Sequence, residues 1–333
     1  MKKKTYLITG GAGFIGSHLV EKILSNKNNK VIVIDNLVNG KIENLNKVKN
    51  RIKFYKYDIS NKKKLDKIFK KQKQIDYVIH LAALADIVPS IENPRKYFDS
   101  NVLGTLNILE LSRKLKIKKF IYIASSSCYG IPKKYPTKEN SEIQTKYPYA
   151  LTKYLGELIV KHWSEVYNIN YTSLRLFNIY GPRSRTTGAY GAVMGVFLSQ
   201  KLNNKPLTIV GNGKQSRDFT FVSDVVDAIL LVIRKKESKN EIFNIGSKKS
   251  ISINYLANFL KGPKKFIPKR PGEPDKTFAD INKINRLLGW KPKVNINEGL
   301  NILLKKINDW KFAPIWTVNK IKNATKLWFK YLR

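Results

Sequence analysis

The residues best suited to chemistry in this chain of 333 residues are a glycine cluster near its start and a tyrosine–lysine pair near its middle. Tyr149 and Lys153 are four positions apart, so both side chains lie on the same side of a helix that Pro148 is expected to begin. A free phenol has a pKa of about 10 and is a poor base at neutral pH, but a neighbouring ammonium favours the phenolate. The pair therefore predicts a tyrosine that takes a proton from an alcohol, with its pKa lowered by the lysine.

The glycines follow a β-branched, apolar run from Thr5 to Thr9 and precede a helical pattern. A strand, a tight turn and a helix in this order form the pyrophosphate cradle of a dinucleotide-binding fold. We expect Gly11 to permit the turn, Gly13 to let the backbone approach phosphate, and Gly16 to let the helix pack on the strand. The predicted cradle, whose helix start supplies free N–H groups to an anion, consists of Gly10, Gly13, Phe14, Ile15 and Gly16.

A second apolar strand, Val31 to Ile34, ends in Asp35 and Asn36. A carboxylate at the end of this strand suits the ribose 2′-hydroxyl of NAD and repels the 2′-phosphate of NADP. The sequence therefore predicts NAD as the cofactor.

Three consecutive serines follow another strand, Phe120 to Ala124. The carboxyl ends of parallel strands face the ligand crevice, so Ser125 is expected to hydrogen-bond the reacting oxygen. The order of cofactor turn, serine strand end and Tyr/Lys helix predicts Ser125, Tyr149 and Lys153 as catalytic residues. They would serve hydride transfer between a nicotinamide and a sugar-like alcohol, and Tyr149 and Lys153 would also contact the cofactor.

The elements that position these residues alternate between strand and helix patterns through the first half of the chain. Strands are expected at 5–9, 31–34, 53–57, 77–81, 120–124 and 171–176. This alternation predicts an α/β fold with a doubly wound parallel sheet of the Rossmann type. The NAD-binding domain is expected over residues 1–180, with returns near 218–245. A smaller, irregular α/β substrate-binding lobe is expected over 181–310, where Gly and Pro become frequent.

The last segment, 311–333, is basic and lacks acidic residues, and its apolar residues fall near helical spacing. It predicts a basic amphipathic helix that packs on its own domain. A helix lying at a membrane surface is the alternative.

Composition adds a charge question. The chain has 63 Lys and Arg against 24 Asp and Glu, a net charge of +39. The lysines are spread through the chain and no nucleic-acid-binding signature accompanies them, so we expect no specific nucleic acid partner. A basic Rossmann-type protein that binds polyanions without catalysis is the non-enzyme alternative.

The cysteine, the apolar runs and the histidines argue against a disulfide-bonded, a membrane-spanning and a metal-binding protein. One cysteine, Cys128, permits no internal disulfide and fits the cytoplasm. The longest apolar run, near residues 225–233, is too short to span a bilayer, so no transmembrane segment is expected. The histidines His18, His80 and His162 have no metal-site spacing, and no metal is expected.

Taken together, these residues resemble the extended short-chain dehydrogenase/reductase superfamily, and within it the NAD-dependent nucleotide-sugar epimerases and dehydratases. The resemblance covers about residues 5–292. It is carried by ordered blocks at 9–18, 58–59, 80–83, 101–102, 125–130, 149–153, 175–182, 217–219 and 270–273.

The resemblance implies roles for further residues. Asp58 and Ile59 would flank the adenine, and Leu81, Ala82, Ala83 and Asn101 would line the cofactor and the active-site floor. On the substrate side, Asn178, Arg217 and Arg270 would hold a diphosphate, Glu273 would lie near the nucleotide ribose, and Ser126 and Ser127 would face the sugar. Members of this family commonly form homodimers, so a homodimer is expected.

The serine loop separates the subfamilies. In 4,6-dehydratases an Asp and a Glu stand where this chain has Ser126 and Ser127, and decarboxylases that make UDP-xylose carry a glutamate at the position of Ser127. Inversion at carbon 4 needs only hydride removal and return, so the resemblance favours a 4-epimerase, an isomerase, most similar to those acting on UDP-glucose and UDP-N-acetylglucosamine. A UDP-glucuronate epimerase and a dTDP- or GDP-sugar dehydratase or reductase remain open.

The sugar is indicated by one position. In such epimerases the residue seven positions after the phosphate-binding arginine gates the pocket, and here it is Thr277. A small side chain leaves room for a 2-acetamido group, so UDP-N-acetylglucosamine is expected beside UDP-glucose. The segment 188–193 also resembles epimerases of acetamido or uronic sugars, and Arg183 and Arg185 are candidates to meet a sugar carboxylate.

Overall fold

The central sheet consists of seven strands that all run parallel. The computed structural model describes residues 3–72, 74–184 and 193–332. The strands are β1 (Thr5–Thr9), β2 (Lys30–Ile34), β3 (Ile52–Tyr55), β4 (Tyr77–His80), β5 (Lys119–Ser125), β6 (Tyr171–Leu176) and β11 (Glu241–Ile245). Their order is β11-β6-β5-β4-β1-β2-β3, so the chain reverses its direction of travel across the sheet between β1 and β4. Ligands bind at such a reversal, beyond the carboxyl ends of the strands.

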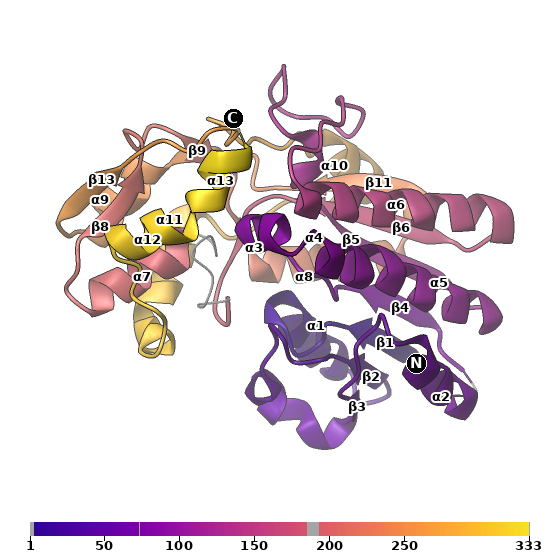
Figure 1. Ribbon diagram of the computed structural model, residues 1–333. Helices are drawn as coiled ribbons and strands as arrows, with labels where there is room; N and C mark the ends of the chain where they lie inside the picture. Colours follow the sequence, from indigo (N-terminus) through magenta and orange to yellow (C-terminus); the bar gives the residue numbers. More distant parts are fainter. Residues whose placement is uncertain (1–2, 73, 185–192, 333) are drawn as a thin grey trace.

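Helices cover both faces of the sheet (Figure 1). One face carries α1 (Phe14–Leu24) and α8 (Val222–Arg234), and the other carries α2 (Lys62–Lys71), α5 (Gly104–Lys114) and α6 (Pro148–Tyr167). Alternate strand residues point to opposite faces of the sheet. Ile8 therefore packs in the hydrophobic cluster under α1 and α8, and Leu7 packs in the cluster under α2, α5 and α6. Because both faces are buried, the strands are mostly apolar, and β6 is the main exception with its buried Thr172, Ser173 and Arg175. The predicted doubly wound α/β fold is confirmed.

Shorter elements complete this sheet lobe. They are η1 (Ile42–Arg51), α3 (Ile87–Glu92), α4 (Pro94–Tyr97), η2 (Phe98–Leu103), η3 (Ser126–Tyr129), η4 (Lys236–Ser238) and α10 (Asn282–Leu288). The predicted strands agree with those observed to within one or two residues at each end, and 5–9 and 171–176 agree at both ends. The return near 218–245 supplies α8 and the edge strand β11.

The second lobe has its own hydrophobic cluster, formed around Phe197, Leu256, Leu303 and Trp310. Its helices are α7 (Val193–Leu202), α9 (Ile253–Leu260), α11 (Ile296–Lys305) and the short η5 (Ile307–Trp310). Its strands form three pairs of two: β7 (Ile179–Tyr180) with β10 (Thr220–Phe221), β9 (Ser216–Arg217) with β12 (Ile251–Ser252), and β8 (Leu207–Val210) with β13 (Lys264–Ile267).

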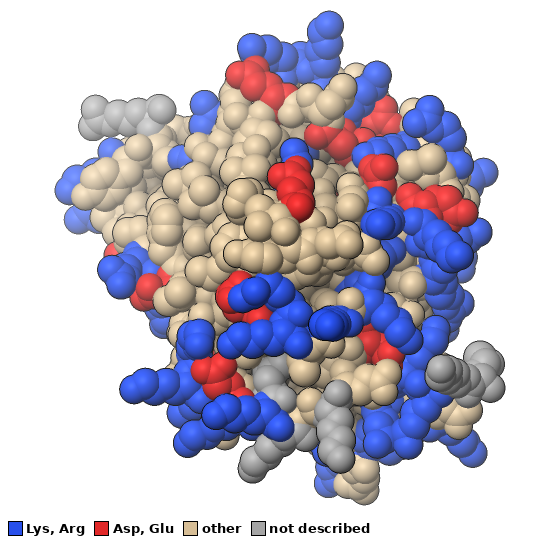
Figure 2. Space-filling model, turned by 90° about the vertical axis from the view of Figure 1, so that its right-hand side faces the viewer, with Lys and Arg blue, Asp and Glu red and all other residues tan. Residues whose placement is uncertain are grey.

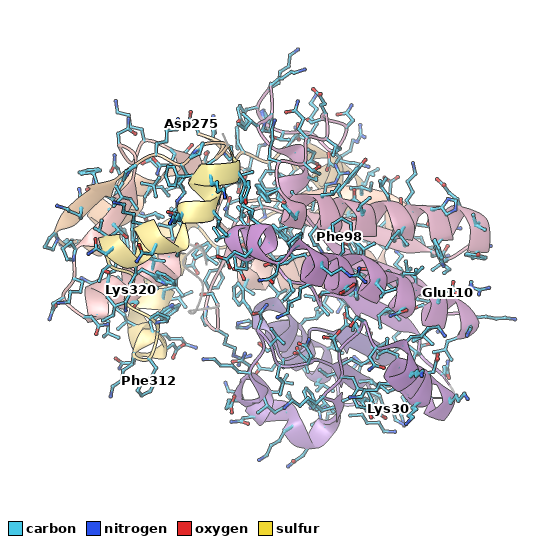
Figure 3. The ribbon with its side chains drawn as sticks, viewed as in Figure 1. Lys30, Phe98, Glu110, Asp275, Phe312 and Lys320 are labelled. Atoms are coloured by element: carbon cyan, nitrogen blue, oxygen red, sulfur yellow. The ribbon has the colours of Figure 1, made fainter. Side chains whose placement is uncertain are left out.

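The C-terminal segment differs from the single helix expected over 311–333. It forms two short helices, α12 (Val318–Ala324) and α13 (Lys326–Tyr331), separated at Thr325. The Thr325 hydroxyl donates to the Lys322 carbonyl oxygen, and such side-chain bonds to the backbone compete with helix continuation. Ile321 and Trp328 are buried against the protein, whereas Phe312, on the turn before α12, is 92% exposed and points outward (Figure 3). The segment therefore packs on its own chain.

Basic side chains are distributed widely over the surface. Figure 2 shows Lys and Arg along much of the outline of one face, around a broad area with few charged groups. On this face the charge forms no single continuous patch, in agreement with the dispersed lysines of the sequence.

Candidate active site

The glycine turn between β1 and α1 is built by backbone contacts. Gly10 has a φ of +71°, and its N–H donates to the Ile34 carbonyl oxygen at 2.8 Å. A Cβ atom on Gly16 would overlap the Gly10 carbonyl oxygen, so the helix can approach the turn only with glycine there. The expectation that Gly11 supplies the turn conformation is wrong: Gly10 holds the left-handed φ, and Gly11 instead gives space to the Val33 side chain.

The turn forms one end of a cavity of about 340 Å³ at the carboxyl edge of the sheet. Helix α1 starts there and has no acidic residue in its first turn. Its first N–H groups lack partners within the helix, and the positive end of the helix dipole points the same way, so this end suits an anion. The predicted residues that line the cavity are Gly10, Gly13, Phe14, Ile15, Gly16, Asp35, Asn36, Ile59, Leu81, Ala82 and Ala83.

Asp35 presents its carboxylate at the end of β2. Its Oδ2 accepts from the Ala12 N–H at 2.9 Å and its Oδ1 accepts from the Leu37 N–H at 2.8 Å. Burial raises the pKa of this carboxyl, and the two backbone bonds oppose that rise. The bonds fix the orientation of the carboxylate at the cavity wall, where a ribose hydroxyl could donate to it.

Asp58 lies behind the cavity rather than in its lining. It accepts from Asn36 Nδ2 at 2.7 Å and from both the N–H and the hydroxyl of Ser60. Burial alone would raise the pKa of Asp58, but these hydrogen bonds lower it below its usual value. Asp58 therefore orders Asn36, which does line the cavity.

The sequence analysis missed other residues of the cavity wall. Val38, Gly40 and Tyr57 lie just after the ends of β2 and β3. The signal that could have identified them is their position, since loops at the carboxyl ends of parallel strands face the ligand.

Asn101 is buried beneath the loop that follows β4. Its side chain donates to the Leu84 carbonyl oxygen and to the Thr152 hydroxyl, and accepts from the Leu84 N–H. It thus connects the cavity loop to helix α6, and it lies behind the cavity lining rather than in it. His80 bonds Thr9 and Thr105 through its two ring nitrogens, as expected of a structural histidine.

The predicted catalytic hydroxyls meet where β5 ends and α6 begins. Pro148 is the first residue of α6, and the Tyr149 hydroxyl donates to Ser125 Oγ at 3.2 Å. Burial raises the pKa of Tyr149, while the Ser125 hydrogen bond opposes that rise. Ser126 and Ser127 belong to η3, and the buried Ser127 Oγ has no hydrogen-bond partner among the described residues.

Lys153 is buried next to this pair. Its Nζ donates to the Ile123 carbonyl oxygen at 2.6 Å and lies 4.4 Å from the centroid of the Tyr122 ring. Burial lowers the pKa of Lys153 to about 7. The expected lowering of the Tyr149 pKa by Lys153 is not observed, because the ammonium bonds a carbonyl and a ring face rather than the phenol.

Two of the three predicted diphosphate residues, Arg217 and Arg270, come together in the second lobe. Arg217 Nη2 donates to Glu273 Oε1 at 2.7 Å, and Arg270 Nη1 lies 3.7 Å from Glu273 Oε2. Arg217 and Glu273 also line a second cavity, of about 510 Å³, together with Lys214 and Lys269. One carboxylate thus holds two guanidinium groups at the edge of a basic cavity, an arrangement that can bind phosphate oxygens in pairs.

Asn178 and Thr277 form a second pair. Thr277 Oγ1 donates to Asn178 Oδ1 at 2.9 Å and accepts from the Asp218 N–H at 3.0 Å. The threonine hydroxyl therefore connects three segments of the chain.

Of the two arginines considered for a sugar carboxylate, only Arg183 can be placed. Its Nη2 donates to Glu21 Oε1 of α1 at 2.7 Å. Arg185 and most of the 188–193 segment, residues 188–192, lie outside the described residues.

Two absences follow for the part of the chain that the structure covers. No group of three or more His, Cys, Asp or Glu side chains there is arranged to hold a metal ion. None of the helices described is both long and apolar enough to cross a membrane.

The first cavity fits NAD. The glycine turn that a Cβ would fill, the helix start without acidic side chains and the fixed Asp35 carboxylate suit a pyrophosphate and an adenosine ribose. Ile59 and Tyr57 supply apolar surface for the base.

Comparison with known proteins agrees with this geometry. Residues 6–246 match the model of the NAD dependent epimerase/dehydratase family. A putative UDP-glucose 4-epimerase of Methanocaldococcus jannaschii is 40% identical over 311 residues, which are 91% of this chain and 97% of that protein. The UDP-glucuronate 4-epimerase of Thermodesulfobacterium geofontis is 35% identical over 334 residues, covering 95% and 99% of the two chains.

A solved structure shares the fold as well as the sequence. It is the UDP-N-acetylglucosamine 4-epimerase of Methanobrevibacter ruminantium in complex with UDP-N-acetylmuramic acid, with a TM-score of 0.84 and 34% identity. The match covers 92% of this chain and 100% of that one. The chain therefore belongs to the NAD dependent epimerase/dehydratase family and is an NAD-dependent enzyme of the nucleotide-sugar epimerase/dehydratase type.

Proposed function

We propose that this chain is a UDP-sugar 4-epimerase that interconverts UDP-glucose and UDP-galactose and also accepts the N-acetylated pair. The observation that carries this proposal is the end of β5, where Ser125 lies 3.2 Å from Tyr149 and serines occupy the next two positions. Elimination of water needs a positioned acid and base, which serine does not replace. Inversion at carbon 4 needs a base for one hydroxyl only.

The chain's own groups would carry the proton. Tyr149 would take the proton of the sugar 4-hydroxyl, and Ser125, already bonded to the phenol, would orient that hydroxyl and share the proton. NAD, when bound, accepts hydride from carbon 4 and later returns it, so the reaction has no net oxidation. Lys153 would hold the cofactor ribose, since its Nζ bonds the carbonyl oxygen of Ile123, a residue that lines the cavity.

Inversion also requires the sugar to turn over while the remainder of the substrate stays bound. Arg217 and Arg270, joined through Glu273, would anchor the diphosphate in the second lobe. Anchoring at the diphosphate leaves the sugar ring free to present either face to the cofactor.

The sugar preference rests on Thr277 and on the relatives. A threonine is smaller than the tyrosine that limits a pocket to hexoses, which supports acceptance of an acetamido group. The relatives are described as acting on UDP-glucose, UDP-N-acetylglucosamine and UDP-glucuronate. UDP-glucuronate is less favoured, since Glu21 already pairs with the Arg183 side chain that would meet a carboxylate.

A homodimer is part of the proposal. Large apolar side chains are exposed on η2 and on the neighbouring helix α6, at Phe98, Leu103, Leu151 and Leu158. Phe98 is labelled in Figure 3, on the sheet lobe near the centre of the view. Pairing of two such faces would bury them. Sedimentation at micromolar concentration would test it, with Leu158→Glu expected to yield monomers.

The deciding experiment uses the purified protein with UDP-glucose, UDP-N-acetylglucosamine, UDP-glucuronate and dTDP-glucose, analysed by proton NMR at equilibrium. We expect galacto-configured products from the first two. A 4-keto-6-deoxy product or a net change in NADH would instead identify a dehydratase or reductase. Conversion of UDP-glucuronate alone would replace the proposed substrate.

A further inference from the structure

The buried indole of Trp328 on α13 lies at the predicted substrate site. Trp328 is 1% exposed, and its Nε1 donates to the Pro271 carbonyl oxygen at 2.6 Å. Pro271 follows Arg270 directly, so this bond fixes the backbone next to a predicted phosphate-binding side chain.

The indole contacts the two ends of the site at once. The Arg270 guanidinium carbon lies 5.8 Å from the centroid of the Trp328 ring. The ring of Tyr147 lies 6.3 Å from the indole, and the same ring stacks on Tyr149 at 6.3 Å with an interplanar angle of 11°. A continuous row of side chains therefore runs from Arg270, at the diphosphate end, to Tyr149, at the sugar end.

Helix α13 also joins the two lobes. It packs on α3 of the sheet lobe, while the Trp328 indole bonds the loop after Arg270 in the second lobe. Figure 1 shows α13, in yellow, at the inner side of the second lobe near α3. Residues of α13 thus contact both lobes next to the predicted substrate residues.

A ring face is a suitable partner for a phosphate-binding arginine. Glu273 lies 3.7 Å from Arg270 but forms its short bond, 2.7 Å, with Arg217. A ring face attracts the guanidinium through its electrons and uses none of its N–H donors. The contact with the ring therefore restrains Arg270 without itself occupying an N–H donor.

We propose that Trp328 is a positioning residue for the nucleotide-sugar substrate: it orients Arg270 toward the diphosphate and, through Tyr147, closes the site over Tyr149. This inference rests on the proposed function, in which Arg270 binds the diphosphate. It assigns a binding role to α13, whose sequence suggested only packing or membrane contact.

The test compares Trp328→Leu with Trp328→Phe, because both keep an apolar side chain but only Phe keeps a ring face. The measurements are the Kd for UDP by calorimetry and the KM and kcat for the preferred UDP-sugar. We expect Leu to weaken UDP binding about 3- to 10-fold and to raise KM similarly with a smaller change in kcat, and Phe to stay within about 2-fold of wild type. Phe329→Leu on the exposed face of α13 is the matched control, and thermal melting of each variant monitors the fold.

A double-mutant cycle with Arg270→Ala tests whether Trp328 affects UDP binding through Arg270. If Trp328 acts through Arg270, Trp328→Leu has little further effect on UDP binding once Arg270 is removed. Equal weakening by Trp328→Leu with and without Arg270, or equal loss in the Leu and Phe variants, would overturn the inference and leave the proposed function standing. Unchanged UDP binding in Arg270→Ala would overturn the inference together with the proposed diphosphate role of Arg270, whereas the 4-epimerase reaction is tested separately by the NMR products.

Discussion

The two lobes hold their site residues in different ways. In the sheet lobe the site follows the ends of parallel strands, and backbone groups fix it: Gly10 bonds Ile34, and the N–H groups of Ala12 and Leu37 hold Asp35. In the second lobe Arg217 lies on a strand of two residues, Arg270 and Glu273 lie in a loop, and ion pairs between side chains join them.

This difference indicates how far the site in each lobe tolerates substitution. A site held by backbone geometry is fixed together with the fold and tolerates little. A site held by side chains can be altered one residue at a time with graded effects. The relatives agree with this division, since they share an NAD-dependent fold but are described with different UDP-sugars.

The largest effect is expected where the lobes meet, at the phenol. Tyr149→Phe removes the proposed base and should lower kcat about 10²- to 10⁴-fold, with NAD content and melting temperature little changed. Tyr154→Phe, the same substitution on helix α6, is the control and should keep near-wild-type kcat. Substantial turnover by Tyr149→Phe would remove the phenol from the mechanism.

In the sheet lobe, where backbone groups hold the site, we expect one substitution to impair both NAD binding and stability. In Gly16→Val the new side chain meets the Gly10 carbonyl and the Gly11 backbone, which cannot move aside, so we expect loss of bound NAD and about 1–3 kcal/mol lower stability. NAD content after purification and urea unfolding would measure both. Gly289→Ala, at a φ of +74° with open space around it, should lose about 1 kcal/mol but keep NAD. Retention of NAD by Gly16→Val would contradict the claim that the site in the sheet lobe tolerates less change than the site in the second lobe.

In the second lobe, where side chains hold the site, we expect a single substitution to have a graded effect on substrate binding. Arg217→Lys keeps the charge but loses the planar fork, so KM for the UDP-sugar should rise about 10-fold while NAD stays bound. Arg234→Lys, at an exposed position in the last turn of α8, should leave KM unchanged. Loss of NAD in Arg217→Lys would show that the two lobes are not independent.

Thr277 should change specificity and leave the chemistry intact. Thr277→Tyr is expected to lower kcat/KM for UDP-N-acetylglucosamine about 10- to 100-fold through steric exclusion and to spare UDP-glucose. Thr277→Ser keeps the hydroxyl that bonds Asn178 and should resemble wild type. Equal losses for both sugars in the tyrosine variant would assign Thr277 a structural role only.

The smallest effect concerns Lys119, a side-chain anchor within the backbone-held lobe. Its Nζ donates to the Val232 carbonyl oxygen at 2.8 Å and to Ser238 Oγ at 2.7 Å, and burial lowers its pKa to about 8. Between pH 8 and the ordinary value of about 10.5, the unfolded chain binds the proton more tightly than the folded chain. The stability of wild type relative to Lys119→Met should therefore rise with pH through this window, by about 1 kcal/mol after allowance for solvent screening. Urea unfolding at pH 7.5 and pH 10 would measure it, and a falling difference would contradict the lowered pKa.

Much of the fold and of the cofactor cavity could be predicted from the sequence because both are local. Thr5–Thr9 is a strand because it is apolar and β-branched, and Asp35 faces the cavity because it directly follows the next strand. Details that depend on close packing were less accessible. Gly10 rather than Gly11 takes the left-handed turn, and Gly11 is needed instead for its close contact with Val33 from another strand.

The predicted substrate residues could be listed from the resemblance, but their partners could not. The Arg217–Glu273 pair joins residues 56 positions apart, and the Asn178–Thr277 bond joins residues 99 positions apart. The placement of Lys153 against Tyr122 also needed the structure, because residue spacing gives a shared helix face but not the partner that faces it.

The sequence by itself determined the order of the functional features along the chain. They are a glycine turn, a carboxylate after the second strand, serines after a later strand, and a helix that carries the Tyr/Lys pair. These features follow from short-range patterns of apolar and glycine residues, which the backbone converts directly into elements. Only the tertiary structure decided which distant side chains share a site, and above all that Trp328, from the last helix, lies between Arg270 and Tyr147. The reason is physical: such contacts arise when separate segments bury side chains together, and no local pattern records which segments will meet.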